Sequence, residues 1–441
     1  MIMNSIYLKK TALLLTAVLT FCPCLQAQEI LSLSLDDCRK QALQQSETLQ
    51  QAGNKLQQAE LDQKIAAAAY LPKLDGSATG TYIFPDMDMM GMKLQMRGMY
   101  MAGISLTQPL YAGGKIRTGQ RLARIGEQAA REQVRLTQAE VILEAENAYW
   151  TLIAVKSKVR MLEAYHAQMD SLYRQVETSV QAGFATDDAL LRIESERSEI
   201  SYQLQKARGG ANLCRLSLCR LLGLNPDIQI EPADTAIHIS APEKLHADIS
   251  NRPELHLLQQ QAKAAHEQIQ MKRADMLPTV GLVAGYTYYG NIKMKGSVAT
   301  ANGVMPYTEE FRDGLGALML SVQVPLFEWG AKLKKVKKAQ LEAEHANLEM
   351  QKNKRLLELE VQQTLQNLND GYRLVQTAEL ALKRAKENLR VTENRYSVSM
   401  AILTDLLDAE SQKQQAESNL IEAKTQYKIY EADYKRAIGA L

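Results

Sequence analysis

The sequence predicts a mainly α-helical protein with membrane β-strands, built from two structural repeats that each combine long coiled-coil helices with a β-hairpin. Three observations predict this fold: the distribution of proline, a gap-free internal repeat, and short stretches of alternating apolar residues. The 441-residue chain has 11 prolines, yet residues 110–225 and 326–441 contain none. Because proline interrupts helix interiors, these two blocks of equal length can form very long helices.

The charge balance and the absence of catalytic motifs exclude several classes of function. The chain has 52 Lys and Arg against 50 Asp and Glu, so no basic excess exists to neutralise nucleic-acid phosphates. It lacks a phosphate-binding glycine loop and a nucleophile elbow, and its 6 histidines show no zinc-ligand spacing. We therefore expect no enzymatic activity, no metal site, no cofactor and no nucleic-acid partner.

The N-terminus has the pattern of an export signal. Two lysines precede an apolar run over residues 11–21, and the small residue Ala27 follows, which predicts a signal peptide over residues 1–27. Lipid attachment at Cys22 or Cys24 is the alternative, although their neighbours are unlike those of a lipid-attachment motif. The other three cysteines (Cys38, Cys214 and Cys219) are expected to be small buried side chains.

An internal repeat covers most of the remaining chain. Pro109-Leu110-Tyr111 recurs as Pro325-Leu326-Phe327, an offset of 216 residues, and this offset continues without a gap to Gly223 and Gly439. Upstream, Leu71-Pro72 recurs as Leu277-Pro278 with an offset of 206. We expect repeat 1 over residues 28–223, an irregular inter-repeat segment over 224–252 and repeat 2 over 253–441.

Both repeats are expected to contain the same elements in the same order. Repeat 1 should have a helix over 35–70, a β-hairpin over 72–110, a long helix over 114–182 and a returning helix over 186–222. Repeat 2 should have a helix from 253, a β-hairpin over 278–326, a long helix over 330–398 and a returning helix over 401–438.

The long helices carry the spacing of coiled coils. Apolar residues step by three and four from Leu152 to Val180, with His166 on the same seam, where packing is its expected role. A helix from Gly114 to Gly183 would be about 104 Å long at 1.5 Å per residue. The helices before and after it together match this length, so one continuous rod could pack against two stacked ones.

The strands cannot form a closed structure within one chain. Apolar residues alternate with small or polar ones over 100–106, 280–288 and 318–324, and more weakly over 73–84. Such alternation is typical of a transmembrane β-strand and equally of a half-buried antiparallel strand. Four strands are too few for a barrel and an open edge cannot face lipid, so a membrane role requires several chains to share one barrel.

Three aromatic residues lie where strands meet long helices: Tyr111, Phe327 and Trp329. An interfacial aromatic belt would place such residues there, and ordinary packing at a strand–helix corner would do so as well.

The chain resembles the TolC-like outer-membrane efflux protein family over essentially its whole mature length. The resemblance rests on the Leu-Pro pairs, on Gln108–Gly114 and Val324–Gly330 at the strand ends, on Asn251-Arg252-Pro253-Glu254-Leu255 and on Leu403-Thr404-Asp405-Leu406-Leu407-Asp408-Ala409. It implies a homotrimer whose four strands per chain complete a twelve-stranded barrel in the outer membrane. It further implies an α-helical tunnel that crosses the periplasm and docks to a periplasmic adaptor and an inner-membrane pump.

Two acidic residues near the second helical tip are candidates for a pore constriction. Asp405 and Asp408 are three residues apart and share a helix face, so a trimer with that face inward would hold two rings of carboxylates. The resemblance implies aspartate rings at a closed periplasmic entrance. Without the resemblance, two solvated acids at a helix start are the better explanation of the pair; with it, the rings are favoured. The family often has a basic residue in a closed-state lock where this chain has Ala401.

The two tips are candidates for adaptor docking. They are Ala182-Gly183-Phe184 and Val398-Ser399-Met400, and they resemble the Val-Gly-Leu-like docking turns of the family, with Ser399 a departure. Glycine suits the left-handed position that reverses a helix. Exposed apolar residues such as Phe184 and Met400 favour contact with a partner.

The segment from Met87 to Met101 contains seven methionines in fifteen residues. Thioethers bind Cu(I) and Ag(I), so a metal-efflux specialisation is one interpretation, and a flexible outer loop with lipid-facing side chains is the favoured one.

Together these patterns predict a passive trimeric exit duct of a tripartite efflux or type I secretion system, located in the outer membrane of a Gram-negative cell. Its partner pump would be of the RND or ABC type and would supply the energy. The alternative is a periplasmic coiled-coil adaptor or scaffold protein.

Overall fold

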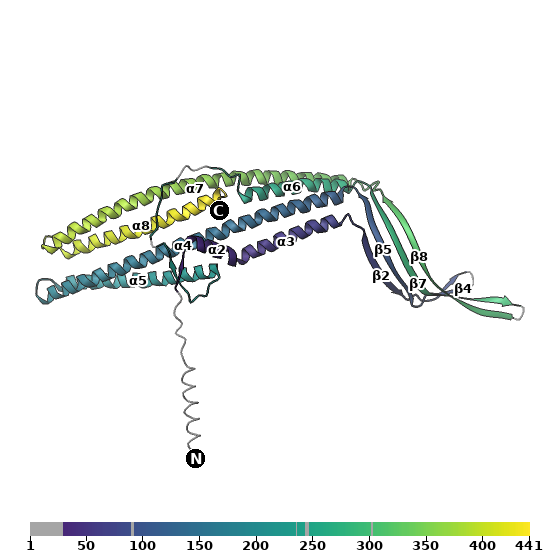
Figure 1. Cartoon of the computed structure of the whole chain (residues 1–441), viewed down its shortest axis with the longest axis horizontal. Helices are drawn as coiled ribbons and strands as arrows, with labels where there is room; N and C mark the ends of the chain where they lie inside the picture. Colours follow the sequence, from purple (N-terminus) through teal and green to yellow (C-terminus); the bar gives the residue numbers. More distant parts are fainter. Residues whose placement is uncertain (1–29, 90–91, 235, 243–246, 301–302) are drawn as a thin grey trace, which may run out of the picture.

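The computed structural model describes residues 30–441 apart from 90–91, 235, 243–246 and 301–302. The predicted signal peptide and its cysteines therefore lie outside the described residues. Figure 1 shows an elongated molecule in which all the long helices lie at one end and the long strands at the other. The expectation of a mainly α-helical chain with few strands is confirmed.

The two long helices set the length of the molecule. Helix α4 spans Lys115–Gln181 and helix α7 spans Ala331–Ser397, each with 67 residues, which corresponds to about 100 Å. Helices α5 (Asp187–Leu222) and α8 (Leu403–Ala437) return from their far ends. Helices α3 (Glu47–Ala68) and α6 (Pro253–Ala274) pack along the halves near the strands. Each long helix thus lies beside two shorter ones placed end to end (Figure 1).

The expectation of one helix over residues 35–70 is wrong. Helix α2 (Leu35–Gln45) ends at Ser46, and α3 begins at Glu47. The amide of Ser46 donates to Ala42 O at 2.9 Å, and its hydroxyl accepts from Leu49 N at 3.2 Å. Ser46 therefore caps both helices, because its side chain satisfies an amide that a helix start leaves free.

Four long strands form one antiparallel sheet. Strands β2 (Lys73–Thr81), β5 (Met99–Ala112), β7 (Thr279–Thr300) and β8 (Gly303–Gln323) pair in the order β2-β5-β7-β8. The short strands β3 (Met87–Met89) and β4 (Met92–Gln95) form a small hairpin, and β4 pairs with the outer part of β7. The sheet stays open, with β2 and β8 at its two edges.

The inter-repeat segment is more ordered than its composition indicates. Strand β6 (Gln229–Pro232) pairs in parallel with β1 (Ile30–Leu33), so the expectation of an irregular stretch throughout 224–252 is wrong at this point. The hydroxyl of Tyr149 on α4 donates to Leu33 O at 3.3 Å and to Asp234 Oδ2 at 2.9 Å. These contacts fix both strands to the middle of the long helix.

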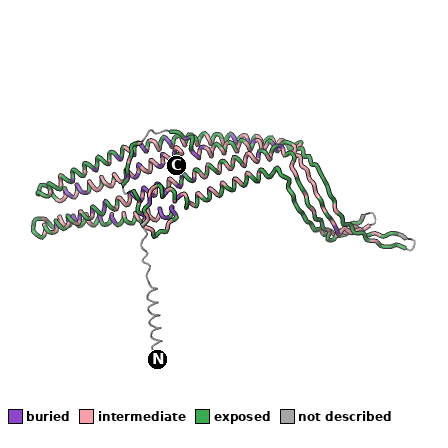
Figure 2. Tube along the Cα trace, in the orientation of Figure 1, coloured by how far each residue is buried: buried purple, intermediate pink, exposed green. Residues whose placement is uncertain are grey.

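The buried residues lie mainly along the helices, whereas the strands are mostly exposed or intermediate (Figure 2). One cluster surrounds Leu152 and Trp150 at the level of β6, and another surrounds Met169 and Val176 nearer the tips. The tip cluster also contains Leu389 and Leu406, so it joins the α4–α5 hairpin to the α7–α8 hairpin. Within the described residues, no helix is long and apolar enough to cross a membrane.

Candidate functional site at the helical tips

The two tips have the same backbone structure. Phe184 N donates to Ser179 O at 2.8 Å, and Met400 N donates to Arg395 O at 2.7 Å. In both tips a residue with positive φ precedes this amide: Gly183 has a φ of 77° and Ser399 a φ of 59°. Both tips therefore have the left-handed helix ending, in which an amide beyond the turn donates to a carbonyl that the end of the helix leaves unpaired. Ser399 adopts the conformation that glycine has in the first tip, at some cost in strain.

Both tips present large apolar side chains to solvent. Phe184 is 89% exposed and Met400 is 79% exposed, and the neighbouring Val398 and Ile402 are exposed as well. Figure 1 shows the two helical hairpins ending at the same end of the molecule, farthest from the strands. A group of exposed apolar residues at such an end is suited to contact with another protein.

The aspartate pair lies just beyond the second tip. Asp405 and Asp408 are both exposed, whereas the neighbouring Leu406 and Ala409 are buried against the first hairpin. The carboxylate of Asp405 accepts from Ile402 N at 3.3 Å, as an acid in the first turn of a helix can. Asp405 thus has a local role in the helix start. The helix face that the two aspartates share is nevertheless exposed to solvent in the single chain.

Sequence reasoning missed a third acid at this end. Glu410 is 2% exposed, and its Oε1 accepts a hydrogen bond from the side-chain amide of Gln168 on α4. Its other oxygen has no hydrogen-bond partner among the described residues. Burial, with a smaller contribution from the charge of Glu393, raises the pKa of Glu410 to about 7. Its position four residues after the buried Leu406 was the available signal, because that spacing shares a helix face.

The aromatic residues at the strand–helix junction are exposed in the single chain. Tyr111 is at the end of β5, and Phe327 and Trp329 lie between β8 and α7. The rings of Phe327 and Trp329 pack edge to face with centroids 5.1 Å apart. Trp329 is 87% exposed and has a φ of 51°, at the position where the first repeat has Gly113. No contact within the described chain explains these exposed rings.

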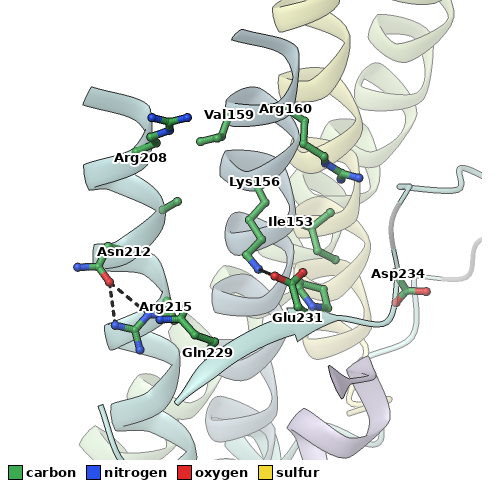
Figure 3. Close-up of a pocket in the computed structure, with 12 residues that line it drawn as sticks. Ile153, Lys156, Val159, Arg160, Arg208, Asn212, Arg215, Gln229, Glu231 and Asp234 are labelled. Carbon is green, nitrogen blue, oxygen red and sulfur yellow. Dashed lines mark hydrogen bonds and ion pairs between the residues drawn. The ribbon is translucent and has the colours of Figure 1, made fainter. Parts of the chain in front are cut away.

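A pocket of about 410 Å³ lies at the level of β6, between α4 and α5 (Figure 3). Two of its basic residues hold the inter-repeat segment. Lys156 Nζ donates to Ile230 O and to Glu231 Oε1, both at 2.7 Å, and Arg215 Nη1 donates to Ile228 O at 2.7 Å. The arrangement is structural, because these cations satisfy the backbone carbonyls of Ile228 and Ile230.

The cysteines, His166 and the methionine-rich segment, which the sequence also singles out, lie away from the tip turns. Cys38 and Cys219 are buried in the cluster around Leu152, and burial raises the pKa of Cys38 to about 12. His166 contacts Asp170 and Ser201 on the helical hairpin. In the methionine-rich segment, Met92 Sδ accepts from the hydroxyl of Tyr307 at 3.2 Å. Binding of Cu(I) or Ag(I) there stays a prediction.

The architecture by itself defines a class of protein. A sheet of four long strands with two open edges continues directly into helices about 100 Å long. Exposed apolar turns lie at the far end of these helices. This combination is typical of channels that join a membrane barrel to a helical tunnel.

The chain belongs to the outer membrane efflux protein family, whose model matches residues 38–223 and 245–440. The outer membrane protein TolC of Escherichia coli is 24% identical over 390 residues, covering 85% of this chain and 76% of TolC. The alkaline protease secretion protein AprF of Pseudomonas aeruginosa is 22% identical over 341 residues, covering 74% of this chain and 67% of AprF.

A solved structure shows the same fold. The CmeC outer membrane channel of Campylobacter jejuni superposes with a TM-score of 0.77 at 17% identity, covering 92% of this chain and 85% of CmeC. The protein is therefore an outer-membrane efflux channel of the TolC family that extends into the periplasm, and it is not an enzyme. The alternative of a periplasmic adaptor or scaffold is not supported.

Proposed function

We propose that three copies of this chain form a passive exit duct that serves a tripartite efflux or type I secretion system. The observation that carries this proposal is the open sheet, in which the outer edges of strands β2 and β8 have no partner strand in the described chain. A strand edge with unsatisfied amides and carbonyls cannot face lipid. Three chains with four strands each would satisfy these edges in one barrel, as the family resemblance implies.

The helical tips are the proposed docking site for a periplasmic adaptor, itself bound to an inner-membrane pump of the RND or ABC type. Gly183 and Ser399 shape the two turns, and Phe184 and Met400 supply the apolar contact. Energy enters through the pump, because the chain has no nucleotide-binding motif.

Asp405 and Asp408 form the proposed constriction near these tips. Both residues are exposed on α8, beside the packed Leu406 and Ala409. In a trimer with this side inward, two rings of three carboxylates would attract cations and narrow the entrance. Because this chain has Ala401 where the family often has a basic residue, the contacts that lock the closed state should differ from those of such relatives.

Tyr111, Phe327 and Trp329 are the proposed interfacial aromatics of the barrel. Their exposure at the strand–helix junction fits contact with the head-group region of outer-membrane lipid.

The proposal is tested by purifying the protein from the outer-membrane fraction in detergent. Sedimentation should give a particle of three chains, and planar bilayers should show cation-selective conductance. A monomer or dimer without conductance would contradict the proposal.

A further inference from the structure

The boundary between the sheet and the helices carries a concentration of positive charge. The chain as a whole has 52 basic against 50 acidic residues. The segments that join the strands to α4, α6 and α7 are residues 111–117, 272–276 and 327–338, and they contain nine Lys and Arg but only two acids, Asp275 and Glu328. These nine residues, the junction cations, give the boundary a larger excess of positive charge than the entire chain has.

Five of the junction cations lie at the start of α7, where helix electrostatics disfavour them. Helix α7 begins at Ala331 and has no acidic residue in its first turn. Cations are unfavourable there, because the N-terminal end of a helix has a partial positive charge. Lys334 and Lys338 are also four residues apart, a spacing at which like charges on a helix repel. Helix formation therefore does not explain these lysines, whereas an external anion would relieve their repulsion.

Both acids of the junction are already paired. Lys332 Nζ lies 2.7 Å from Glu328 Oε1, and Lys115 Nζ lies 2.6 Å from Asp275 Oδ1. The hydrogen bond from Lys115, with a smaller contribution from the charge of Lys335, lowers the pKa of Asp275. Cations from α4 and α7 thus share one carboxylate, and the acids of the chain leave most of the positive charge unbalanced.

The cations of α7 are accessible for contact with a partner. Lys334, Lys335, Lys337 and Lys338 are exposed. Lys334 and Lys337 form no ion pair within the described residues, and Lys338 Nζ is 3.7 Å from Glu342 Oε1. Residues 331–338 rise by about 12 Å along the helix. Lysine side chains at these positions can therefore extend to the head groups of a membrane whose apolar core surrounds the strands.

An apolar pocket of about 210 Å³ lies beside the lysines. Its lining includes the apolar residues Met276, Leu326, Phe327 and Leu333 together with Lys332. Leu326 is 89% exposed and Phe327 is 72% exposed. A ligand that joins an anionic group to an apolar chain fits this arrangement, because the lysines would bind the charge and the pocket would remove the chain from water.

We propose that the junction cations bind anionic phospholipid, such as phosphatidylglycerol, in the periplasmic leaflet of the outer membrane. Its phosphate group lies against the exposed lysines of α7, and the first part of an acyl chain lies in the pocket beside Leu326 and Phe327. Basic side chains next to a membrane attract anionic head groups over about one Debye length, roughly 8 Å at physiological salt. This inference rests on the proposed function, which places the sheet in the membrane, and it adds the class of lipid that the junction selects.

Quenching of tryptophan fluorescence by brominated lipid tests the proposal in reconstituted channels. The chain has two tryptophans. Trp329 is 87% exposed at the junction, whereas Trp150 is 7% exposed and lies about 50 Å along α4 from the start of that helix. Bromine quenches tryptophan only at short range, so quenching by lipid reports on Trp329, and Trp329→Phe should abolish it. The vesicles contain phosphatidylcholine and a minor share of phosphatidylglycerol, with acyl bromines close to the glycerol on one lipid or the other.

Brominated phosphatidylglycerol should quench at least about threefold more than an equal amount of brominated phosphatidylcholine, and high salt should reduce this preference. Replacement of the four exposed lysines of α7 by glutamine (Lys334, Lys335, Lys337 and Lys338) should abolish the preference. The matched control replaces four exposed lysines farther along the same helix (Lys352, Lys354, Lys383 and Lys386) and should keep it. Inorganic phosphate at matched ionic strength should not compete.

Equal quenching by the two lipids in conducting trimers would overturn the lipid selection and leave the proposed function intact. The same conclusion would follow if the lysine variant kept the preference and instead shifted the reversal potential, because the lysines would then line the tunnel. Competition by inorganic phosphate would show a site for free phosphate and overturn the binding of lipid. Absence of trimers and of conductance would overturn the proposed function as well.

Discussion

The side-chain amide of Gln168 on α4 donates a hydrogen bond to the buried carboxyl group of Glu410 on α8, 242 residues away in the chain. This contact lies in the apolar cluster that holds the two helical hairpins together near their tips. Glu410 lies within two turns of Asp405, so this contact joins α4 to the part of α8 in which the constriction is proposed.

Glu410→Gln should stabilise the protein at alkaline pH and have little effect at pH 4.5. Burial raises the pKa of Glu410 to about 7 from an ordinary value of 4.5, so wild-type stability is lost as pH rises through this interval and the buried group must ionise. The gain at pH 8 should be about 1–3 kcal/mol per chain. Thermal midpoints in detergent at both pH values measure it. The repeat mate, Glu194→Gln, is exposed and should change neither midpoint; an equal gain at both pH values for Glu410→Gln would refute the explanation.

Asp405→Asn with Asp408→Asn should reduce cation selectivity and block by divalent cations in planar bilayers. The two rings of carboxylates would lose their charge, while Asn can still accept the hydrogen bond from Ile402 N. The control is Asp187→Asn with Asp188→Asn, which removes two exposed acids from the first turn of α5. Unchanged reversal potentials in the Asp405–Asp408 variant would rule out the constriction.

Phe184→Asp should reduce efflux and site-specific cross-linking to the adaptor by about tenfold or more, because a charge at an apolar contact is costly to desolvate. Phe184→Leu keeps an apolar side chain on the same exposed turn and should retain most activity. Resistance assays and cross-linking in cells measure both. Full efflux by Phe184→Asp would withdraw the docking role.

Glycine should be the favoured residue at both tip turns. Ser399→Gly should stabilise the second tip and Gly183→Ala should destabilise the first, each by about 1 kcal/mol, because both positions have positive φ. No atom lies within 4 Å of a Cβ placed on Gly183, so the cost there is conformational only. Amide hydrogen exchange of the tips measures the change. Slower exchange in Gly183→Ala would contradict it.

Much of the fold could be predicted because its signals are local and repeated. Proline-free blocks and heptad spacing predict α4 and α7, and an offset of 216 relates Lys115 to Ala331 and Gln181 to Ser397 at their ends. The break at Ser46 could not be predicted, since the serine sits within a run of good helix formers and acts through its cap hydrogen bonds. The pairing of β1 with β6 was also hidden, because it joins two short strands about 200 residues apart.

The sequence by itself determined the duplication, the long helices, the strand pattern and the candidate residues at the tips, because each depends on spacing along the chain. Only the tertiary structure decided which surfaces remain open: the edges β2 and β8, the apolar side chains Leu61 and Ile65, and the exposed face of Asp405. It also decided that Glu410 is buried. Burial and edge pairing depend on which distant segments pack together, and periodicity along one segment does not contain that information.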